Sequence, residues 1–449
     1  MRQEEYDVVI IGSGIGGLCA GALLAHWGYE ALVVEKLSRI GGRCSTEEYE
    51  GFKLPTGAVA IHKGPMADIF DEVGSPLELV MVPRLFYRLE GKDYEMPAKG
   101  ALSTLLDIIN KLEVERGKLV GHLVKAVATE KVREALGRGF HRPEKETLTF
   151  RDWLLQYTDN ELAHDLFDTI SSLTGGHSYE HPASSVFEFF LGMGGMREVG
   201  LAAHSNVVEM EKLAKVIRSS GDVWTNCLAR RILVEGGIAK GLVVQMDGSE
   251  VEIASQVVIS NAGPKQTVEL AGERNFDERY LRLTRLKHRP GPVTLGFVAS
   301  DRSLWPEGGE PAILMLTGTR RITSIVPVSN IVPGLAPPGQ HLLFAFGFPR
   351  SNLVHMDKEE EQRQVSLDLK EQLPLLENRG RILKVEPRDI DNPFNNGTPT
   401  GFGIPTETPV RNLYNVGDGC LGYGLTGSTG AAESGKRVAE RIRRTFKPR

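Results

Sequence analysis

A glycine-rich turn near the N-terminus constrains the fold of this 449-residue chain more than any other feature. Gly12, Gly14 and Gly17 form a G-x-G-x-x-G pattern, which follows the apolar run 8–11 and precedes a segment rich in small residues. A second apolar run, residues 31–34, comes after that segment. Strand, glycine turn, helix and strand in this order predict a βαβ unit that binds a dinucleotide.

Each glycine of the pattern has its own steric role. Gly12 allows the tight turn, Gly14 lets the backbone approach a diphosphate, and Gly17 lets the helix pack closely on the strand. The diphosphate is then expected at the amino end of the helix, where unpaired N–H groups favour negative charge. Glu35 ends the second strand and is placed to accept hydrogen bonds from the adenosine ribose, and Lys36 is assigned to the same site. An acid here favours FAD or NAD over NADP.

Two further segments decide between FAD and NAD. Residues 41–43 read Gly-Gly-Arg, so the chain turns back at Gly42 and Arg43 offers a charge-assisted contact to the phosphates. Near the C-terminus a short apolar run ends in Gly417-Asp418, and residues 427–446 have a helical pattern that begins with small side chains. The amino end of such a helix stabilises the negative charge of a reduced flavin. These segments favour FAD.

Together these segments resemble the FAD-dependent amine oxidase and phytoene desaturase superfamily, most closely its branch of phytoene desaturases, carotenoid isomerases and retinol saturases. The resemblance covers residues 6–62, 221–264 and 411–442. It implies that Asp418 contacts the ribityl chain and that the backbone of Gly427 and Ser428 faces the pyrimidine edge of the flavin. It also implies that Ala229 lies beside the adenine.

The same reading predicts an α/β fold, in which an inserted α+β substrate domain interrupts a discontinuous Rossmann-like FAD-binding domain. The FAD-binding domain is expected to comprise residues 1–65, 205–270 and 405–449, and the substrate-binding domain residues 66–204 and 271–404. Residues 66–200 are expected to be mostly helical. Residues 223–260 are expected to form a small antiparallel meander, and residues 290–350 a multi-stranded sheet.

Composition excludes other classes of function. The net charge of −5 provides no basic stripe, so no nucleic-acid partner is expected. No apolar stretch approaches the ~20 residues that a membrane span needs, although contact with a membrane surface stays open. The four cysteines form no C-x-x-C pair, which fits a reducing cytoplasm.

Some weaker signals have two readings each. His177 and His181 have the spacing of a zinc pair, but Pro182 follows them, so a polar loop without metal is favoured. Cys420 is either a packing residue, which is favoured, or a reactive thiol beside the flavin. The aromatic run 187–190 belongs to a substrate tunnel or to the core, and the basic run 111–138 to a membrane contact or to a solvated helix face.

The expected chemistry is hydride transfer between a substrate carbon and the flavin in a water-poor pocket. The resemblance implies desaturase-like chemistry on a small hydrophobic substrate of isoprenoid or carotenoid type, and no catalytic residue is nominated. One alternative is an amine or amino-acid oxidase. A non-enzymatic alternative is a prenyl-binding protein of the kind of the Rab GDP-dissociation inhibitors, which lack the complete motifs. Because the chain has a single dinucleotide fingerprint, oxygen, a quinone or another carrier is the expected electron acceptor.

Overall fold

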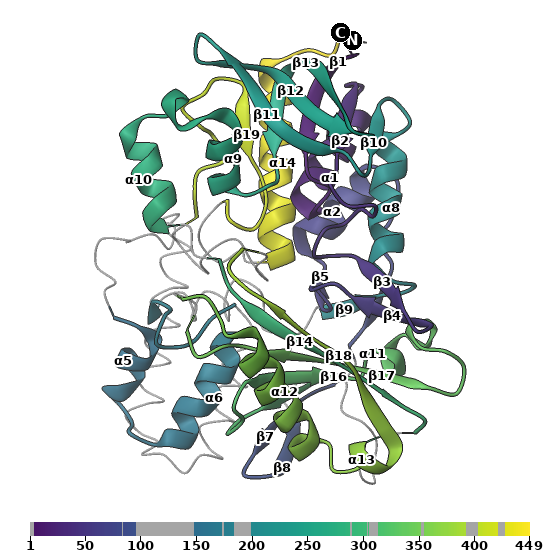
Figure 1. Ribbon diagram of the computed structural model, residues 1–449, viewed down its shortest axis with the longest axis vertical. Coiled ribbons are helices and arrows are strands. Elements are labelled where there is room, and N and C mark those ends of the chain that lie inside the picture. The colour runs from purple at the N-terminus through teal and green to yellow at the C-terminus, as the bar shows by residue number, and fades with distance from the viewer. Residues whose placement is uncertain are drawn as a thin grey trace.

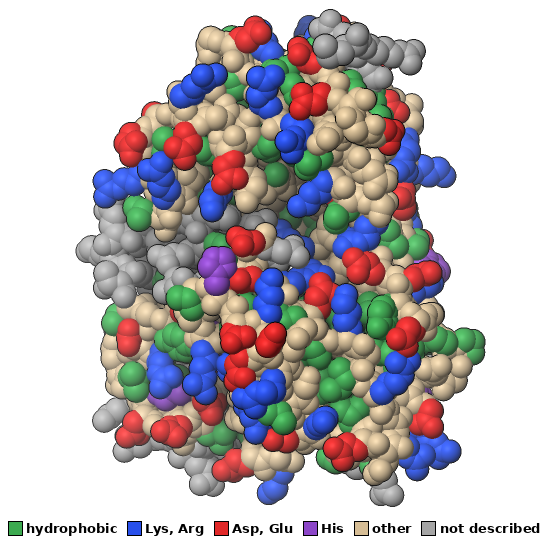
Figure 2. Space-filling model, viewed as in Figure 1, with side chains coloured by type: hydrophobic (Ala, Val, Ile, Leu, Met, Phe, Trp, Pro, Cys, Tyr) green, Lys and Arg blue, Asp and Glu red, His purple; other side chains and the backbone are tan. Residues whose placement is uncertain are grey.

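The computed structural model describes residues 4–82, 84–95, 148–172, 175–183, 199–287, 290–302, 304, 313–351, 354–391, 403–420 and 427–449. Two large sheets lie one above the other along the long axis of the molecule, and both termini lie at the far end of the upper lobe (Figure 1). On the face drawn in Figure 2, Lys and Arg side chains alternate with Asp and Glu side chains.

The upper sheet has a parallel core. In spatial order its parallel strands are β10 (Asp222–Trp224), β2 (Ala31–Val34), β1 (Glu4–Ile11), β13 (Ser249–Ser260) and β19 (Leu413–Asn415). The first half of β13 also pairs with β12 (Ile238–Met246), which pairs in turn with β11 (Leu228–Glu235), and both of these pairings are antiparallel. Strands from three distant parts of the chain therefore lie side by side.

The expected meander over residues 223–260 is only partly right. β11, β12 and β13 do form an antiparallel meander, but β10 pairs in parallel with β2 at the edge of the sheet. The physical reason is the helix α8 (Asn206–Ile217), which precedes β10 and returns the chain across one face of the sheet. A strand that follows such a crossover helix joins its sheet in parallel.

Helices cover both faces of the upper sheet. On one face α1 (Ile15–His26) packs between α8 and α14 (Gly427–Thr445), and α2 (Gly64–Glu72) packs on α14. On the other face α9 (Pro264–Ala271) packs on β11, and α10 (Glu278–Lys287) packs on α9. Every residue of α1 from Ile15 to Ala25 is buried, as expected for a helix enclosed on all sides. Among the described helices, none is long and apolar enough to cross a bilayer.

The lower sheet is mostly antiparallel. Its order is β18 (Gly380–Arg388), β14 (Val293–Ser300), β17 (His341–Gly347), β16 (Ile322–Val326), β15 (Ile313–Leu316), β7 (Leu85–Leu89) and β8 (Lys92–Glu95), with only β15 and β7 parallel. Helix α12 (Lys358–Gln372) covers one face, and α5 (Phe150–Leu155) and α6 (Glu161–Ser172) lie at its side (Figure 1). The two sheets confirm the α/β class with a separate second sheet, while the boundaries of the two domains stay a prediction.

The expectation that residues 66–200 are mostly helical is wrong for part of this range. Strands β6 (Leu79–Met81), β7 and β8 fall in it, and β9 (Val199–Ala202), which begins at its end, pairs with β6 and with β5 (Ile61–His62). Glu90 and Gly91 both have positive φ, which is the geometry of a two-residue hairpin turn and sets β7 against β8. The basic run 111–138 and the aromatic run 187–190 lie outside the described residues.

Candidate functional site

The carboxyl ends of β1, β13 and β19 meet at one edge of the upper sheet. The backbone N–H of Gly12 donates to the carbonyl of Val34 at 2.8 Å, and that of Asn261 donates to the carbonyl of Ile11 at 2.8 Å. On the C-terminal side, Val416 N–H donates to Ser260 at 2.9 Å. The glycine turn and the Gly417-Asp418 turn are therefore adjacent, at the edge where open parallel sheets bind their ligands.

The glycine turn leaves no room for side chains. Gly12 has a φ of +89°, and a Cβ atom at Gly14 would lie 2.5 Å from Nδ2 of Asn261. A Cβ atom at Gly16 would lie 2.8 Å from the backbone nitrogen of Gly417. Helix α1 begins at Ile15 without a side-chain cap, so no capping side chain occupies its amino end. A bare turn at an uncapped helix terminus fits the diphosphate of a dinucleotide.

The carboxylate of Glu35 is held beside this turn. It is 5% exposed, and its Oε2 accepts hydrogen bonds from Ser13 N at 2.9 Å and from Ser13 Oγ at 2.7 Å. Its Oε1 accepts a third, from Leu37 N at 2.9 Å. Glu35 thus lies where an adenosine ribose is expected, whereas the neighbouring Lys36 side chain is exposed. The contact with the ribose stays a prediction for both residues.

The strand predicted to pass the adenine also lies beside Glu35. The backbone N–H of Cys227 donates to the Glu35 carbonyl at 2.8 Å, directly before β11 begins. Ala229, the second residue of β11, is half-buried. Its position fits the predicted contact, which the structure leaves as a prediction.

The structure brings Arg43 and Asp418 together as an ion pair. Each guanidinium nitrogen Nη donates to one carboxylate oxygen at 2.7 Å, which makes the pair bidentate. Burial alone would lower the pKa of Arg43, but the Asp418 carboxylate outweighs it and raises that pKa. The sequence predicted a separate contact to the cofactor for each residue and did not predict that they bond to each other. The pair fixes the orientation of the Asp418 carboxylate.

Neighbouring backbone segments hold this pair in place. The Gly41 N–H donates to the Ser13 carbonyl at 2.9 Å, and Gly42, with a φ of +57°, faces Gly14. On the other side, the Gly417 N–H donates to Oγ of Ser434 in α14 at 2.8 Å. We call the glycine turn at residues 12–17 the phosphate turn and the Gly417-Asp418 turn the flavin turn. The phosphate turn, the Gly-Gly-Arg element and the flavin turn therefore form one connected structure.

Helix α14 begins where the resemblance predicted the flavin pyrimidine edge. Gly427 has a φ of +54° and is exposed, and Ser428 is half-buried. Within the described residues, the buried hydroxyl of Thr429 in the same turn has no hydrogen-bond partner. An unsatisfied hydroxyl in the first turn of a long helix fits a polar ligand edge nearby, although the contacts of Gly427 and Ser428 with flavin stay a prediction.

Sequence reasoning missed three residues of this site. Asn261 lies over the glycine turn, and Thr56 Oγ1 donates to the Gly42 carbonyl at 3.0 Å. Arg388, from the lower sheet, donates to the Thr56 carbonyl. Asn261 could have been found from its place directly after a buried strand, whereas nothing in the local sequence indicates that Arg388 reaches this turn.

The residues present therefore fit FAD, and comparison with known proteins agrees. The family of flavin containing amine oxidoreductases matches residues 15–443. The chain belongs to this family. Its cofactor is FAD, and it is an FAD-dependent oxidoreductase.

Individual relatives include two curated proteins. The chain is 28% identical to a phytoene desaturase of Cercospora nicotianae, over 58% of this chain and 45% of that protein. It is 24% identical to an all-trans-retinol 13,14-reductase of Danio rerio, over 98% of this chain and 86% of that protein. Among solved structures, an oxidoreductase from Methanosarcina mazei matches with a TM-score of 0.81 and 26% identity, covering 97% of this chain and 100% of the other.

Cys420 lies two residues after Asp418 and is packed in the interior. The residue is 1% exposed, and burial, followed by the charge of Asp418, raises the pKa of its thiol far above the ordinary value. A thiol in this environment stays protonated and is a weak nucleophile. The packing role that the sequence favoured therefore fits this geometry better than the role of a reactive thiol.

Both ring nitrogens of His177 have hydrogen-bond partners in the protein. Its Nδ1 lies 2.8 Å from Asp168 Oδ2, and its Nε2 lies 2.6 Å from the Pro349 carbonyl. Both partners are acceptors, so only the doubly protonated ring can donate to both. Burial alone would lower the pKa of His177, but Asp168 outweighs it and raises that pKa. The ring therefore ties α6 to the end of β17. Nearby His181 is buried, which lowers its pKa to about 3.

His177 is expected to make stability depend on pH. A raised pKa means that its contribution is fully present below the ordinary value of about 6.5 and is lost as pH rises through the raised value. We expect His177→Gln to lower the free energy of unfolding by about 1.5–3 kcal/mol at pH 6, the worth of a hydrogen bond to a charged group. The difference from wild type should shrink at pH 9. Urea unfolding at both values checks this, with His341→Gln as control, and a difference independent of pH contradicts it.

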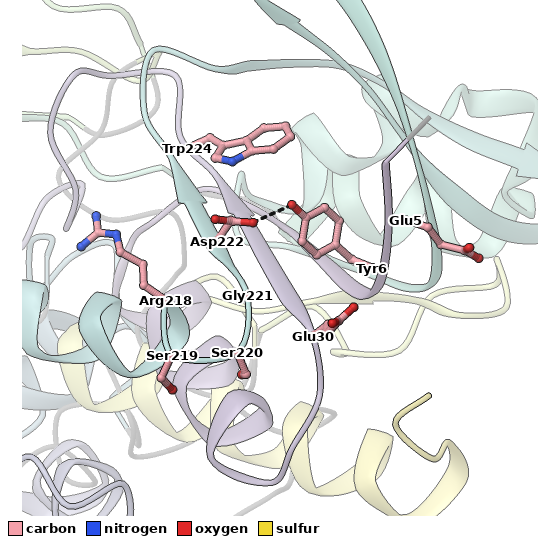
Figure 3. Close-up of a pocket in the computed structure, with 9 residues that line it drawn as sticks. All are labelled: Glu5, Tyr6, Glu30, Arg218, Ser219, Ser220, Gly221, Asp222 and Trp224. Carbon is pink, nitrogen blue, oxygen red and sulfur yellow. Dashed lines mark hydrogen bonds between the residues drawn. The ribbon is translucent and has the colours of Figure 1, made fainter. Parts of the chain in front are cut away.

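A separate pocket lies at the opposite edge of the upper sheet. It is an open hollow of about 730 Å³, lined among others by Tyr6, Glu30, Arg218, Asp222 and Trp224 (Figure 3). The Tyr6 hydroxyl donates to Asp222 Oδ2 at 2.7 Å and closes one side. Because this pocket lies at the amino ends of β1, β2 and β10, it is distinct from the predicted cofactor site at their carboxyl ends.

Proposed function

We propose that this oxidoreductase moves a hydride between the flavin and a carbon atom of a hydrophobic substrate, so that a carbon–carbon double bond forms or is removed. The observation that carries the proposal is the apolar, aromatic packing of the lower sheet, at the end that reaches the Gly-Gly-Arg element through Arg388 and Thr56. The substrate class is isoprenoid or carotenoid.

The lower sheet reaches the predicted flavin site through Arg388. This side chain donates to the Thr56 carbonyl, and the Thr56 hydroxyl donates to the carbonyl of Gly42. In the β-ladder Arg388 is opposite Val293, the first residue of β14. The start of β14 and the end of β18 therefore lie nearest to Arg43 and Asp418.

From this end, one face of the lower sheet is apolar. Phe297 packs on Phe344 with ring centroids 5.1 Å apart, and Phe344 packs on Phe346 at 4.5 Å. The same cluster contains Leu295 from β14 and Val59, which follows the Gly-Gly-Arg element. Phe297, Phe344 and Leu295 are buried in this packed cluster, and Phe346 is only partly buried against it. We propose that a substrate lying against this end of the sheet meets apolar side chains, which favour a hydrocarbon, because a charged amine there would lose hydration without gaining a partner.

Bound FAD supplies hydride transfer through its isoalloxazine ring. In this proposal Asp418, which is paired with Arg43, holds the ribityl chain, and the amino end of α14 favours negative charge at the pyrimidine edge. Desaturation also needs a group that accepts the second proton, and none is assigned. The names of two relatives, phytoene desaturase and all-trans-retinol 13,14-reductase, support chemistry at polyene double bonds.

The family name favours a second candidate, an amine or amino-acid oxidase. In either case we propose that oxygen, a quinone or another carrier reoxidises the flavin, because the sequence has a single dinucleotide fingerprint, which the flavin cofactor uses. Because the proposed substrate is hydrophobic, we also propose that this protein is cytoplasmic and contacts membranes at their surface.

Anaerobic flavin spectroscopy tests this proposal. The oxidised holoprotein is mixed in turn with partly saturated isoprenoids, primary amines, NADH and NADPH, and the dithionite-reduced protein is mixed with conjugated polyenes. We expect an isoprenoid to bleach the oxidised flavin, or a polyene to restore it, within turnover times of about a second or less. Bleaching by amines alone supports the oxidase alternative. Equally rapid bleaching by NADH or NADPH contradicts the proposed source of electrons.

A further inference from the structure

Asn261 lies at the centre of the predicted cofactor site, although no motif assigned it a role. It directly follows β13, and its backbone N–H donates to the Ile11 carbonyl at 2.8 Å. That hydrogen bond fixes its backbone beside the glycine turn, because Ile11 is the last residue before Gly12. The residue is half-buried, so part of it is accessible from the site.

Three glycines show where the side-chain amide of Asn261 lies. Its Nδ2 is 2.5 Å from the position that a Cβ atom on Gly14 would take. Its Oδ1 is 2.9 Å from the corresponding position on Gly16 and 3.0 Å from that on Gly417. The amide therefore spans the gap between the phosphate turn, with its nitrogen towards Gly14, and the flavin turn, with its oxygen towards Gly417.

Within the described residues, this amide makes no hydrogen bond to the protein. The two other asparagines near the same sheet edge are bonded: Asn415 Nδ2 donates to the Tyr280 hydroxyl at 2.6 Å, and Asn412 Nδ2 donates to the Gln256 carbonyl at 3.0 Å. An amide offers two donors and one acceptor, and polar groups in protein interiors are generally paired. Within the described residues, the half-buried Asn261 amide is therefore free to bond a ligand at this site.

We propose that Asn261 binds FAD directly, with Nδ2 donating to a diphosphate oxygen and Oδ1 accepting from a ribityl hydroxyl. The chemistry of the two ends matches their surroundings. A phosphate only accepts, and the nitrogen lies towards Gly14, where the diphosphate is expected. A ribityl hydroxyl can donate, and the oxygen lies towards Gly417, next to Asp418. The inference rests on the proposed placement of FAD over these turns.

Titration of apoprotein with FAD tests this contact. We expect Asn261→Ala to raise the dissociation constant about tenfold to a hundredfold, the effect of losing hydrogen bonds to a charged group. Asn261→Asp keeps the shape but replaces the donor by a carboxylate facing the diphosphate. We expect a larger loss for this variant, and one that decreases as salt screens the repulsion.

Thermal unfolding of the apoproteins separates binding from folding. Asn261→Ala removes no protein hydrogen bond and should leave the apoprotein melting temperature close to that of wild type. The matched control is Asn275→Ala, because Asn275 Nδ2 donates to the Ala271 carbonyl at 2.6 Å, far from the glycine turn. This control should lower the apoprotein melting temperature and leave the FAD dissociation constant unchanged.

Two outcomes overturn different claims. If both Asn261 variants bind FAD as wild type does while Gly14→Val does not, the Asn261 contact is wrong and the cofactor placement stands. If Gly14→Val also binds FAD normally, the placement itself is wrong. Should Asn261→Ala fail to fold, the salt dependence of the isosteric Asn261→Asp decides, and its absence contradicts the contact.

Discussion

Replacing Gly14 by valine should yield a folded protein that contains no FAD. A Cβ atom at this position would already lie 2.5 Å from Asn261 Nδ2, and two methyl groups beyond it would fill the space beside the first turn of α1. The diphosphate needs this space in order to reach the N–H groups of the turn. The measurement is the flavin content of the purified variant, from its visible absorbance after denaturation.

The chain offers a matched control for this substitution. Gly334 has no atom within 4 Å of its Cβ position, and its backbone does not need positive φ. Gly334→Val should therefore retain the wild-type flavin content. Wild-type occupancy in Gly14→Val would show that the dinucleotide binds elsewhere, and loss of flavin in both variants would show that the assay reports general unfolding.

The second large effect is expected at Asp418. Asp418→Ala should weaken FAD binding by about 1.5–3 kcal/mol if the carboxylate bonds the ribityl chain. The adenosine half still anchors the cofactor, so the protein should bind FAD at higher concentration. Loss of the carboxylate also leaves Arg43 without this bidentate partner. In the wild type the Asp418 side chain is only 7% exposed. Titration of the apoprotein with FAD measures the change.

Arg43→Ala and the double variant separate the two roles of Asp418. If Asp418 acts only by orienting Arg43, the double variant should bind FAD no more weakly than Arg43→Ala. If Asp418 contacts the ribityl chain itself, the double variant should bind FAD more weakly than Arg43→Ala. An unchanged dissociation constant in Asp418→Ala removes this carboxylate from the site.

The sequence could predict the parts of the site that depend on short spacings. The turn at Gly12, Gly14 and Gly17 and the acid at Glu35 lie within one βαβ unit, where local backbone geometry dictates which residues can follow one another. The tight hairpin that joins β7 and β8 was missed, because Glu90-Gly91 is a weaker turn signal than the usual Asn-Gly or Asp-Gly. Amphipathic patterns at other positions within residues 66–200 favoured a helical prediction for the whole range.

The sequence by itself determined the α/β class and the cofactor, and it predicted the glycine turn as the phosphate site, because each follows from a pattern within a few tens of residues. Only the tertiary structure decided that Arg43 bonds Asp418, 375 positions away, and that Arg388 reaches Thr56 from the other sheet. It alone set the Asn261 amide over Gly14 and Gly417. Such contacts depend on which strands lie side by side in a sheet, and strand order follows from the packing of the whole chain rather than from local spacing.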